Sequence, residues 1–196
     1  MKIKNVLLLV TAAAIISGCA NNSALLRASS TNIHNDIFTE STVGESVPAG
    51  YTDLSVDFSA KTHKPGIYSA KDIHGTPDYQ LLLNIDGQAV RLQGDPREEN
   101  SGLHGLRDAE AGDGIRYQFS KILRMKAGTH KIVIAIIEDE IVFNRELILA
   151  AGSRNRLVLE PIYRRAPGKR RLGGANVPSF QEGIRGLRVF LNGKPM

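Results

Sequence analysis

Residues 79–93 read YQLLLNIDGQAVRLQ, and this stretch decides the fold class of the chain. Tyr79–Ile85 is rich in apolar residues, as strands are. Asp86-Gly87 follows, a dipeptide that a two-residue hairpin turn favours because both of its central positions need a positive φ. Beyond the turn, Gln88–Gln93 alternates polar and apolar residues, which is the period of a strand with one buried face. The stretch therefore predicts a β-hairpin.

Similar strand signals recur along the rest of the chain. They predict strands over Arg116–Ile122, Lys131–Ile137, Ile141–Leu149, Arg156–Tyr163 and Leu187–Leu191. Turn-forming residues separate these runs, and no segment keeps a helical period over several turns. Short strands with turns between them are typical of sandwiches and barrels. We therefore predict a mostly β chain that folds as an antiparallel β-sandwich.

The segment from Ile122 to Ile134 carries Ala127-Gly128-Thr129-His130 just before a β-branched run. It resembles the PAGTHTVTV pattern of PEGA-like and related immunoglobulin-like surface domains, with Lys126 in place of the usual proline. The resemblance implies an immunoglobulin-like sandwich in which the glycine turn leads into a buried strand, and a structural role for His130. It also implies a binding or spacing module rather than an enzyme.

The first residues have the layout of an export signal. Lys2 and Lys4 precede an apolar run of 11 residues, Val6–Ile16, that only Thr11 interrupts. A membrane-spanning helix needs about 20 apolar residues, so this run is too short to span. We therefore expect it to be a signal peptide that is removed.

Ile16-Ser17-Gly18-Cys19 resembles the lipobox of bacterial lipoproteins. The resemblance implies a diacylglyceryl group on the Cys19 sulfur, cleavage before Cys19, and acylation of the new amino group, which together anchor the chain in a membrane. Ala20 and Asn21 follow where an inner-membrane retention signal has Asp, which favours the outer membrane, facing the periplasm, in a Gram-negative source. The alternative is an ordinary signal peptide with a coincidental cysteine. Cys19 is the only cysteine, so the mature chain has no disulfide.

Composition divides the chain into three parts. Residues 1–18 are the predicted signal peptide, and residues 19–50, rich in Ser, Thr and Asn, are a predicted lipidated tether. Part of this tether, around Ile33–Phe38, can dock on the domain as a strand. Residues 51–196 form the predicted β-sandwich, and Gly94–Gly114 within it is expected to be a long polar loop.

The net charge of +5 is concentrated at the C-terminal end. Residues 145–196 hold eleven Lys and Arg against three Glu. The densest part is a basic arm made of Arg164, Arg165, Lys169, Arg170 and Arg171. Such a run can bind an anionic phospholipid, the phosphates of lipopolysaccharide or an acidic envelope protein. Nucleic acid is not expected, because the chain is predicted to be exported and no aromatic residues interleave with the arm. The alternative is an arm that only improves solubility.

The side chains that carry chemistry form no recognisable catalytic motif. The histidines are His34, His63, His74, His104 and His130, and none has the helical spacing of a zinc site. His63 and His74 can meet across a hairpin and, with Asp72 or Asp78, make a weak metal site. The chain has no G-x-S-x-G elbow, and Gly112-Asp113-Gly114 lacks the helix that phosphate binding needs. We therefore predict no catalytic site, no cofactor and no metal.

These features together predict a lipid-anchored envelope protein that acts as a non-catalytic binding or structural module. The alternative is a hydrolase or metal-dependent periplasmic enzyme built from loop residues. It requires that at least two of four residues meet in one pocket: His63, His74, His104 and Asp108. A binder of small ligands or polysaccharide is a third possibility, but only eleven Tyr and Phe and no Trp are present to line a groove.

Overall fold

The computed structural model describes residues 24–67, 69–100, 110–164 and 179–196. The strands are β1 (Phe38–Glu40), β2 (Tyr51–Thr62), β3 (Gln80–Ile85), β4 (Gln88–Gln93), β5 (Asp95–Glu99), β6 (Gly114–Lys126), β7 (Gly128–Ile136), β8 (Ile141–Leu149), β9 (Arg154–Tyr163), β10 (Ile184–Leu191) and β11 (Lys194–Pro195). The mostly β character that the sequence predicts is confirmed.

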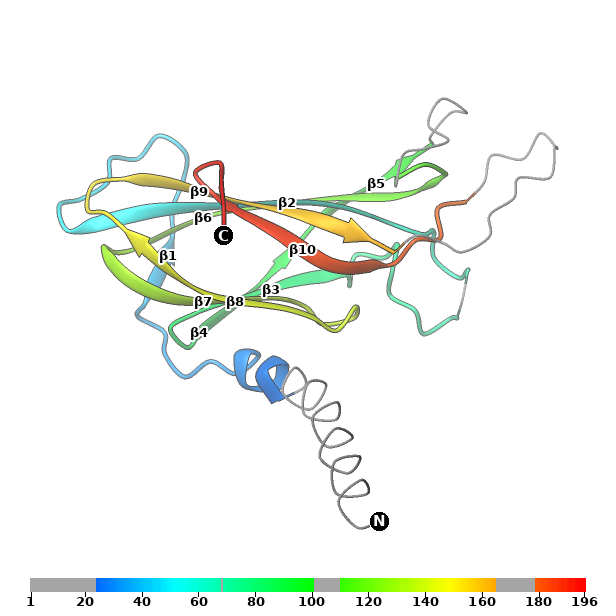
Figure 1. Cartoon of the computed structure of the whole chain (residues 1–196), viewed down its shortest axis with the longest axis horizontal. Coiled ribbons are helices and arrows are strands. Elements are labelled where there is room, and N and C mark those ends of the chain that lie inside the picture. The colour runs from blue at the N-terminus through cyan, green and yellow to red at the C-terminus, as the bar shows by residue number, and fades with distance from the viewer. Residues whose placement is uncertain (1–23, 68, 101–109, 165–178) are drawn as a thin grey trace, which may run out of the picture.

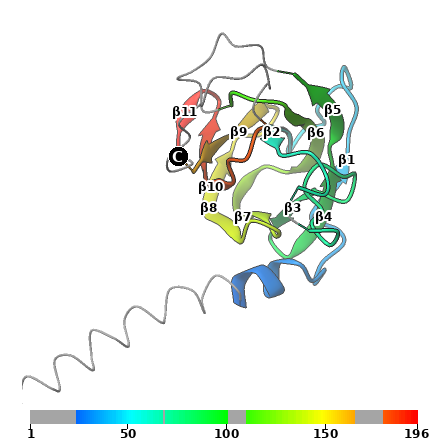
Figure 2. The same cartoon turned by 90° about the vertical axis from the view of Figure 1, so that its right-hand side faces the viewer.

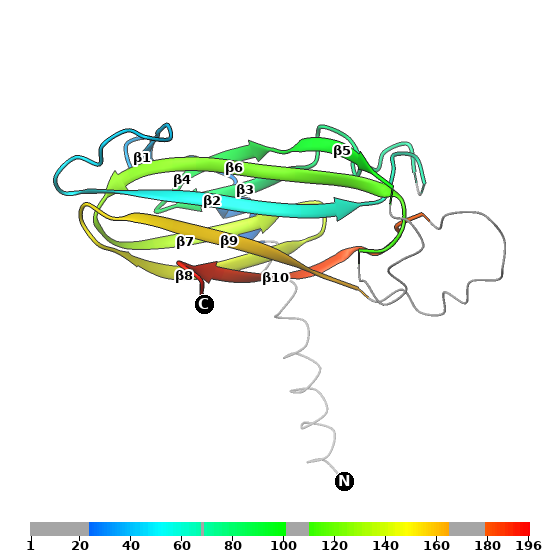
Figure 3. The ribbon, with the colours of Figure 1, turned by 90° about the horizontal axis from the view of Figure 1, so that it is seen from above.

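Within this part of the chain the strands form two sheets that face each other (Figures 1 and 3). Sheet A has the order β1-β6-β2-β9-β10-β11, and β5 also pairs with β6. Sheet B has the order β4-β3-β7-β8. The predicted hairpin is confirmed as β3 and β4, and Asp86 and Gly87 have φ values of 48° and 89°.

The centre of sheet A is a strand that the sequence analysis did not assign. β2 alternates along its length, and Leu54, Val56, Phe58 and Ala60 are all at most 2% exposed. Their side chains meet those of sheet B, such as Leu83, in one core. Full burial of an aliphatic or aromatic side chain stabilises the fold by about 1.5–3 kcal/mol, so this strand is a major contributor to stability.

The expectation of a purely antiparallel sandwich is wrong for one pair of strands. β2 pairs with β9 in parallel, with Asp53–Phe58 beside Arg154–Leu159. The other pairs of named strands in the described chain are antiparallel. Parallel neighbours need a long crossover connection. Here the crossover is most of the domain, because between β2 and β9 the chain builds all of sheet B and also adds β5 and β6 to sheet A.

Much of the segment expected to be a loose tether contacts the sandwich. Residues 24–29 are helical and lie against the outer face of sheet B (Figures 1 and 2). The Asn84 side chain donates a hydrogen bond of 2.9 Å to the carbonyl oxygen of Ser29. Further along, β1 pairs with β6, and Phe38 reaches the core. The tether predicted over residues 19–50 is therefore partly built into the domain.

The loop expected over Gly94–Gly114 begins as a strand. β5 pairs with residues 114–118 of β6, and residues 101–109 lie outside the described chain. Gly94 allows this turn of the chain to pass close to the core, because a Cβ there would lie 2.8 Å from the Phe119 ring.

Candidate functional site

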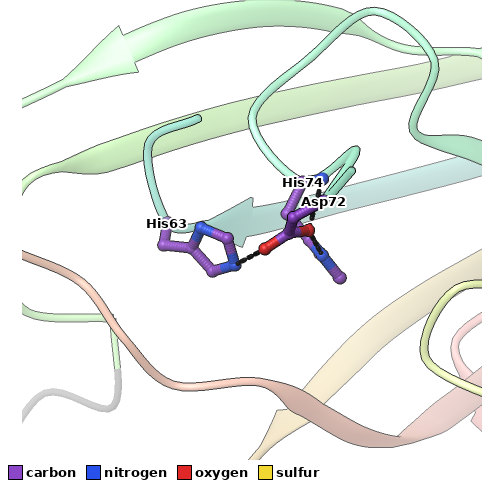
Figure 4. A group of neighbouring side chains, drawn as sticks. All are labelled: His63, Asp72 and His74. Carbon is purple, nitrogen blue, oxygen red and sulfur yellow. Dashed lines mark hydrogen bonds and ion pairs between the residues drawn. The ribbon is translucent and has the colours of Figure 1, made fainter. Parts of the chain in front are cut away.

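Two histidines and an aspartate meet at one end of the sandwich (Figure 4). His63 follows β2 directly, whereas Asp72 and His74 belong to the connection between β2 and β3. The Asp72 carboxylate lies between the two rings (Figure 4). Its Oδ2 is 3.1 Å from His63 Nε2, and its Oδ1 is 2.6 Å from His74 Nδ1. One donor atom from each of the three residues lies within 4.8 Å of the other two.

The connection between β2 and β3 is folded so that His63, at its start, lies close to Asp72 and His74. The backbone N–H of His74 donates a hydrogen bond of 3.0 Å to Asp72 Oδ1, which fixes the carboxylate against the turn. Gly75 has a φ of +78°, and a Cβ at this position would lie 2.7 Å from the carbonyl oxygen of His63. Only glycine combines this backbone conformation with so close an approach. Gly75 therefore brings His74 and His63 together.

A second set of groups orients the two rings. His63 Nδ1 lies 3.0 Å from the carbonyl oxygen of Lys64. His74 Nε2 lies 3.5 Å from Asp139 Oδ1, and Asp139 belongs to the turn between β7 and β8 in sheet B. The Tyr79 hydroxyl donates a hydrogen bond of 2.7 Å to Asp139 Oδ2. Each ring thus faces Asp72 with one nitrogen and an oriented oxygen acceptor with the other.

The carboxylates shift the pKa values of the cluster. Burial lowers the pKa of His74, but hydrogen bonds to Asp139 and Asp72 outweigh it and raise that pKa to about 9. Burial raises the pKa of Asp72, and the hydrogen bonds from His74 more than offset it, so the pKa is lowered. Burial, together with Asp139, raises the pKa of Tyr79 well above its ordinary value. At neutral pH His74 is therefore cationic in the absence of a competing ion, Asp72 is ionised, and Tyr79 is a hydrogen-bond donor.

The cluster is shielded but not sealed. The side chains of His63, Asp72 and His74 are 7%, 14% and 20% exposed. Asp139 also lines a surface hollow of about 400 Å³, together with Arg164 and Arg185. Imidazole nitrogens and a carboxylate oxygen are donors that Zn²⁺ and related ions prefer. The cluster therefore supplies a donor set for a metal at a place that solvent reaches.

A second polar network, centred on the buried Lys61, lies on the neighbouring strands. Lys61 Nζ is fully buried and donates hydrogen bonds of 3.1 Å to Glu99 Oε1 and to the carbonyl oxygen of Glu110. Arg116 contacts both Glu99 and Glu110, each at 2.6 Å. The two cations thus face two carboxylates in the same network. This balance indicates a structural role, because a buried charge is tolerated when it is paired.

The structure brings together two of the four residues that the enzyme alternative requires, His63 and His74. Asp72 joins them, whereas Asp78 is exposed and lies outside the cluster. His104 and Asp108 lie outside the described residues. His130 is held elsewhere, by Asp86 at 2.7 Å and the carbonyl oxygen of Lys126 at 2.8 Å.

Of the predicted lipid and partner sites, only Arg164 is described. It follows β9, and its backbone N–H donates a hydrogen bond of 2.8 Å to the carbonyl oxygen of Gly183. The others lie outside the described chain: Cys19, Arg165, Lys169, Arg170 and Arg171. Sequence reasoning missed Asp139 in the histidine cluster. It belongs to the acidic run Glu138-Asp139-Glu140, and no local signal links it to His74.

Gly75→Ala is expected to destabilise the fold more than Gly66→Ala. Both glycines have a φ of +78°, so both alanines carry a conformational cost of about 1–2 kcal/mol. Only at position 75 does the added Cβ also meet backbone, which adds about 1–3 kcal/mol of overpacking. Urea unfolding of the two variants measures the difference. Equal losses of unfolding free energy would show that the close approach at Gly75 does not matter.

Glu99→Gln is expected to flatten the acid side of the stability profile. Hydrogen bonds from Arg116 and Lys61 lower the Glu99 pKa from 4.5 to about 2, although burial alone would raise it. A lowered folded-state pKa stabilises the fold above pH 4.5, and this contribution is lost as the pH falls toward 2. Urea unfolding between these pH values measures the slope. The matched control is Glu98→Gln, which removes a more exposed carboxylate 3.4 Å from Lys64 and should follow the native profile. A Glu99→Gln profile as steep as the native one would contradict the prediction.

Comparison with protein-family models, curated proteins and solved structures found no match. In the parts of the chain that the structure describes, no helix is long and apolar enough to cross a membrane.

Proposed function

We propose that the chain is a lipid-anchored protein of the bacterial envelope that serves as a non-catalytic binding or structural module. The observation that carries the proposal is the order of Lys2 and Lys4, the apolar run Val6–Ile16, and Ile16-Ser17-Gly18-Cys19. Acylation of Cys19 anchors the chain in a membrane, which is the outer membrane, facing the periplasm, in a Gram-negative source.

An immunoglobulin-like relationship belongs to the same proposal. It is supported by two facing sheets and by the turn at Gly128, which leads directly into β7. Ile132 and Ile134 of β7 are fully buried in the core between the sheets. The turn at Gly152 likewise takes the chain from β8 in sheet B to β9 in sheet A. Domains of this architecture present their sheet faces and loops to partners.

The position of the first helix bears on how the domain is held. Residues 24–29 lie against the outer face of sheet B, and Ala24 is five residues after Cys19. Five residues reach at most about 18 Å even when fully extended. An anchor at Cys19 therefore keeps the domain next to the membrane, with sheet B toward the lipid and sheet A away from it.

The basic arm is the proposed contact for an anionic partner. Arg164 and Arg185 line the same hollow as Asp139, so the arm starts at the same end of the sandwich as the histidine cluster. Crosslinking in cells compares the native chain with one in which the five arm cations (Arg164, Arg165, Lys169, Arg170 and Arg171) are replaced by Gln. An anionic lipid or envelope protein captured by the native chain alone supports the contact, and equal capture by both chains contradicts it.

Cys19→Ser is expected to abolish lipidation. Cells expressing the native chain and fed an alkyne-tagged fatty acid should label it, and mass spectrometry should find the acyl groups on the residue that begins the mature chain. Serine lacks the thiol that accepts the diacylglyceryl group, so the variant should remain unlabelled and keep the mass of the precursor. Ser17→Ala is the matched control, because it keeps a small residue before the cleavage site. Labelling of Cys19→Ser would overturn the anchor.

A fluorophore on sheet B is expected to lie closer to the lipid than one on sheet A. Ile148, which is 80% exposed, faces outward from sheet B, and Gln118 faces outward from sheet A. Because acylation blocks the only native thiol, a cysteine introduced at either position can be labelled alone. In the lipidated chain on vesicles, a quencher attached to lipid headgroups should dim the label at position 148 more than the label at position 118. Equal or reversed quenching would exclude this orientation while leaving lipidation intact.

A further inference from the structure

We infer that His63, Asp72 and His74 form a binding site for one divalent transition-metal ion, with Zn²⁺ as the ion that suits its donors best. The site is independent of the membrane anchor. Metal binding would be a property of the chain in addition to the proposed binding or structural role.

The donor atoms already face one another. In tetrahedral Zn²⁺ sites the metal–nitrogen and metal–oxygen distances of about 2.0–2.2 Å place neighbouring donors about 3.3 Å apart. Asp72 Oδ2 and His63 Nε2 are 3.1 Å apart, and Asp72 Oδ1 and His74 Nδ1 are 2.6 Å apart. The ring centroids of the two histidines are 5.1 Å apart. An ion can therefore enter between the three groups with only small side-chain movements.

The outer contacts are those that metal-bound histidines have. A ligating imidazole usually directs its second nitrogen at a carboxylate or a backbone carbonyl, which fixes the tautomer and the ring orientation. His63 does this with the carbonyl oxygen of Lys64, and His74 does it with Asp139. Tyr79 in turn donates to Asp139, so the orienting carboxylate is itself held. A histidine pair that serves packing alone does not need both rings arranged in this way.

The charges also balance around a dication. Binding of the ion at His74 Nδ1 releases the extra imidazole proton to solvent. With both imidazoles then neutral, Asp72 and Asp139 carry two negative charges in a partly buried region. One divalent ion neutralises both charges at once. The same ion replaces the contacts that the two imidazoles now make with Asp72.

The donor set selects the class of ion. Two imidazoles and one carboxylate suit Zn²⁺ and neighbouring transition metals, whereas Ca²⁺ and Mg²⁺ prefer oxygen donors alone. Three protein donors leave coordination positions for water, and the 14% and 20% exposure of Asp72 and His74 allows water to reach them. This is the arrangement of an open site rather than of a closed structural one.

The test uses the full chain, purified in detergent and stripped of metal with a chelator. A calorimetric titration with Zn²⁺ alone should show one ion bound per chain. Excess Ca²⁺ or Mg²⁺ should not displace this ion. X-ray absorption at the zinc edge should show two imidazoles and oxygen donors. Imidazole nitrogen NMR on the native chain should show His63 and His74 shifting while His34 and His130 do not. This last measurement needs no variant.

Substitutions then identify the ligands. His63→Ala and Asp72→Asn should each weaken Zn²⁺ binding by well over tenfold, and Asp139→Asn should weaken it by about 10–100-fold. In the Zn²⁺-loaded chain, the Asp139→Asn variant should also change the tautomer signal of His74 relative to the loaded native chain. The exposed residues His34 and Asp36 supply the matched controls, and His34→Ala and Asp36→Asn should bind as the native chain does. Circular dichroism checks that each variant folds.

Three results would overturn the site. The first is the absence of saturable Zn²⁺ binding by the native chain. The second is Zn²⁺-induced shifts of His34 or His130 rather than of His63 and His74. The third is unchanged affinity in folded His63→Ala and Asp72→Asn. None of these results bears on lipidation of Cys19, so the failure of the metal site and the failure of the anchor can be told apart.

Discussion

The parallel pairing of β2 with β9 is the constraint on which the rest of the structure depends. β2 lies between β6 and β9 in sheet A, and its inward side chains fill the core. A strand in this position has hydrogen-bonding neighbours on both sides, so neither neighbour can be lost without exposing its backbone groups. Because β9 comes late in the chain, sheet B must be built in between.

Both polar clusters lie where β2 ends. Lys61 belongs to the last residues of the strand and reaches Glu99 and Glu110, whereas His63 is the first residue beyond it. Their roles differ because their partners differ. Lys61 is fully buried among paired charges, which favours a fixed structure. His63 and His74 share one carboxylate at a place that solvent reaches, which leaves room for an ion.

Local patterns predicted the local parts of this architecture. The Asp86-Gly87 hairpin and the bounds of β4 and β8 follow from turn chemistry and period-two alternation. β2 was missed although it alternates, because its polar residues resemble the tether before it. The parallel pairing could not be predicted, since it joins segments that no local signal links. In the same way, the proximity of His63 and His74 could be suggested from one loop. The contact of Asp139 with His74 could not be predicted, because Asp139 belongs to a turn of the other sheet.

The late position of β9 also affects how such a chain would be exported across a membrane. Pairings between distant segments form slowly, because a long loop must close before they stabilise anything. Until β9 has been synthesised, β2 lacks one of its two neighbours and sheet A is incomplete. A chain that carries the export signal proposed above would therefore complete sheet A only late in its synthesis, after β9 and β10 have been made. The strand order that stabilises the finished domain would also delay completion of the fold, which favours transport of a chain that is not yet fully folded.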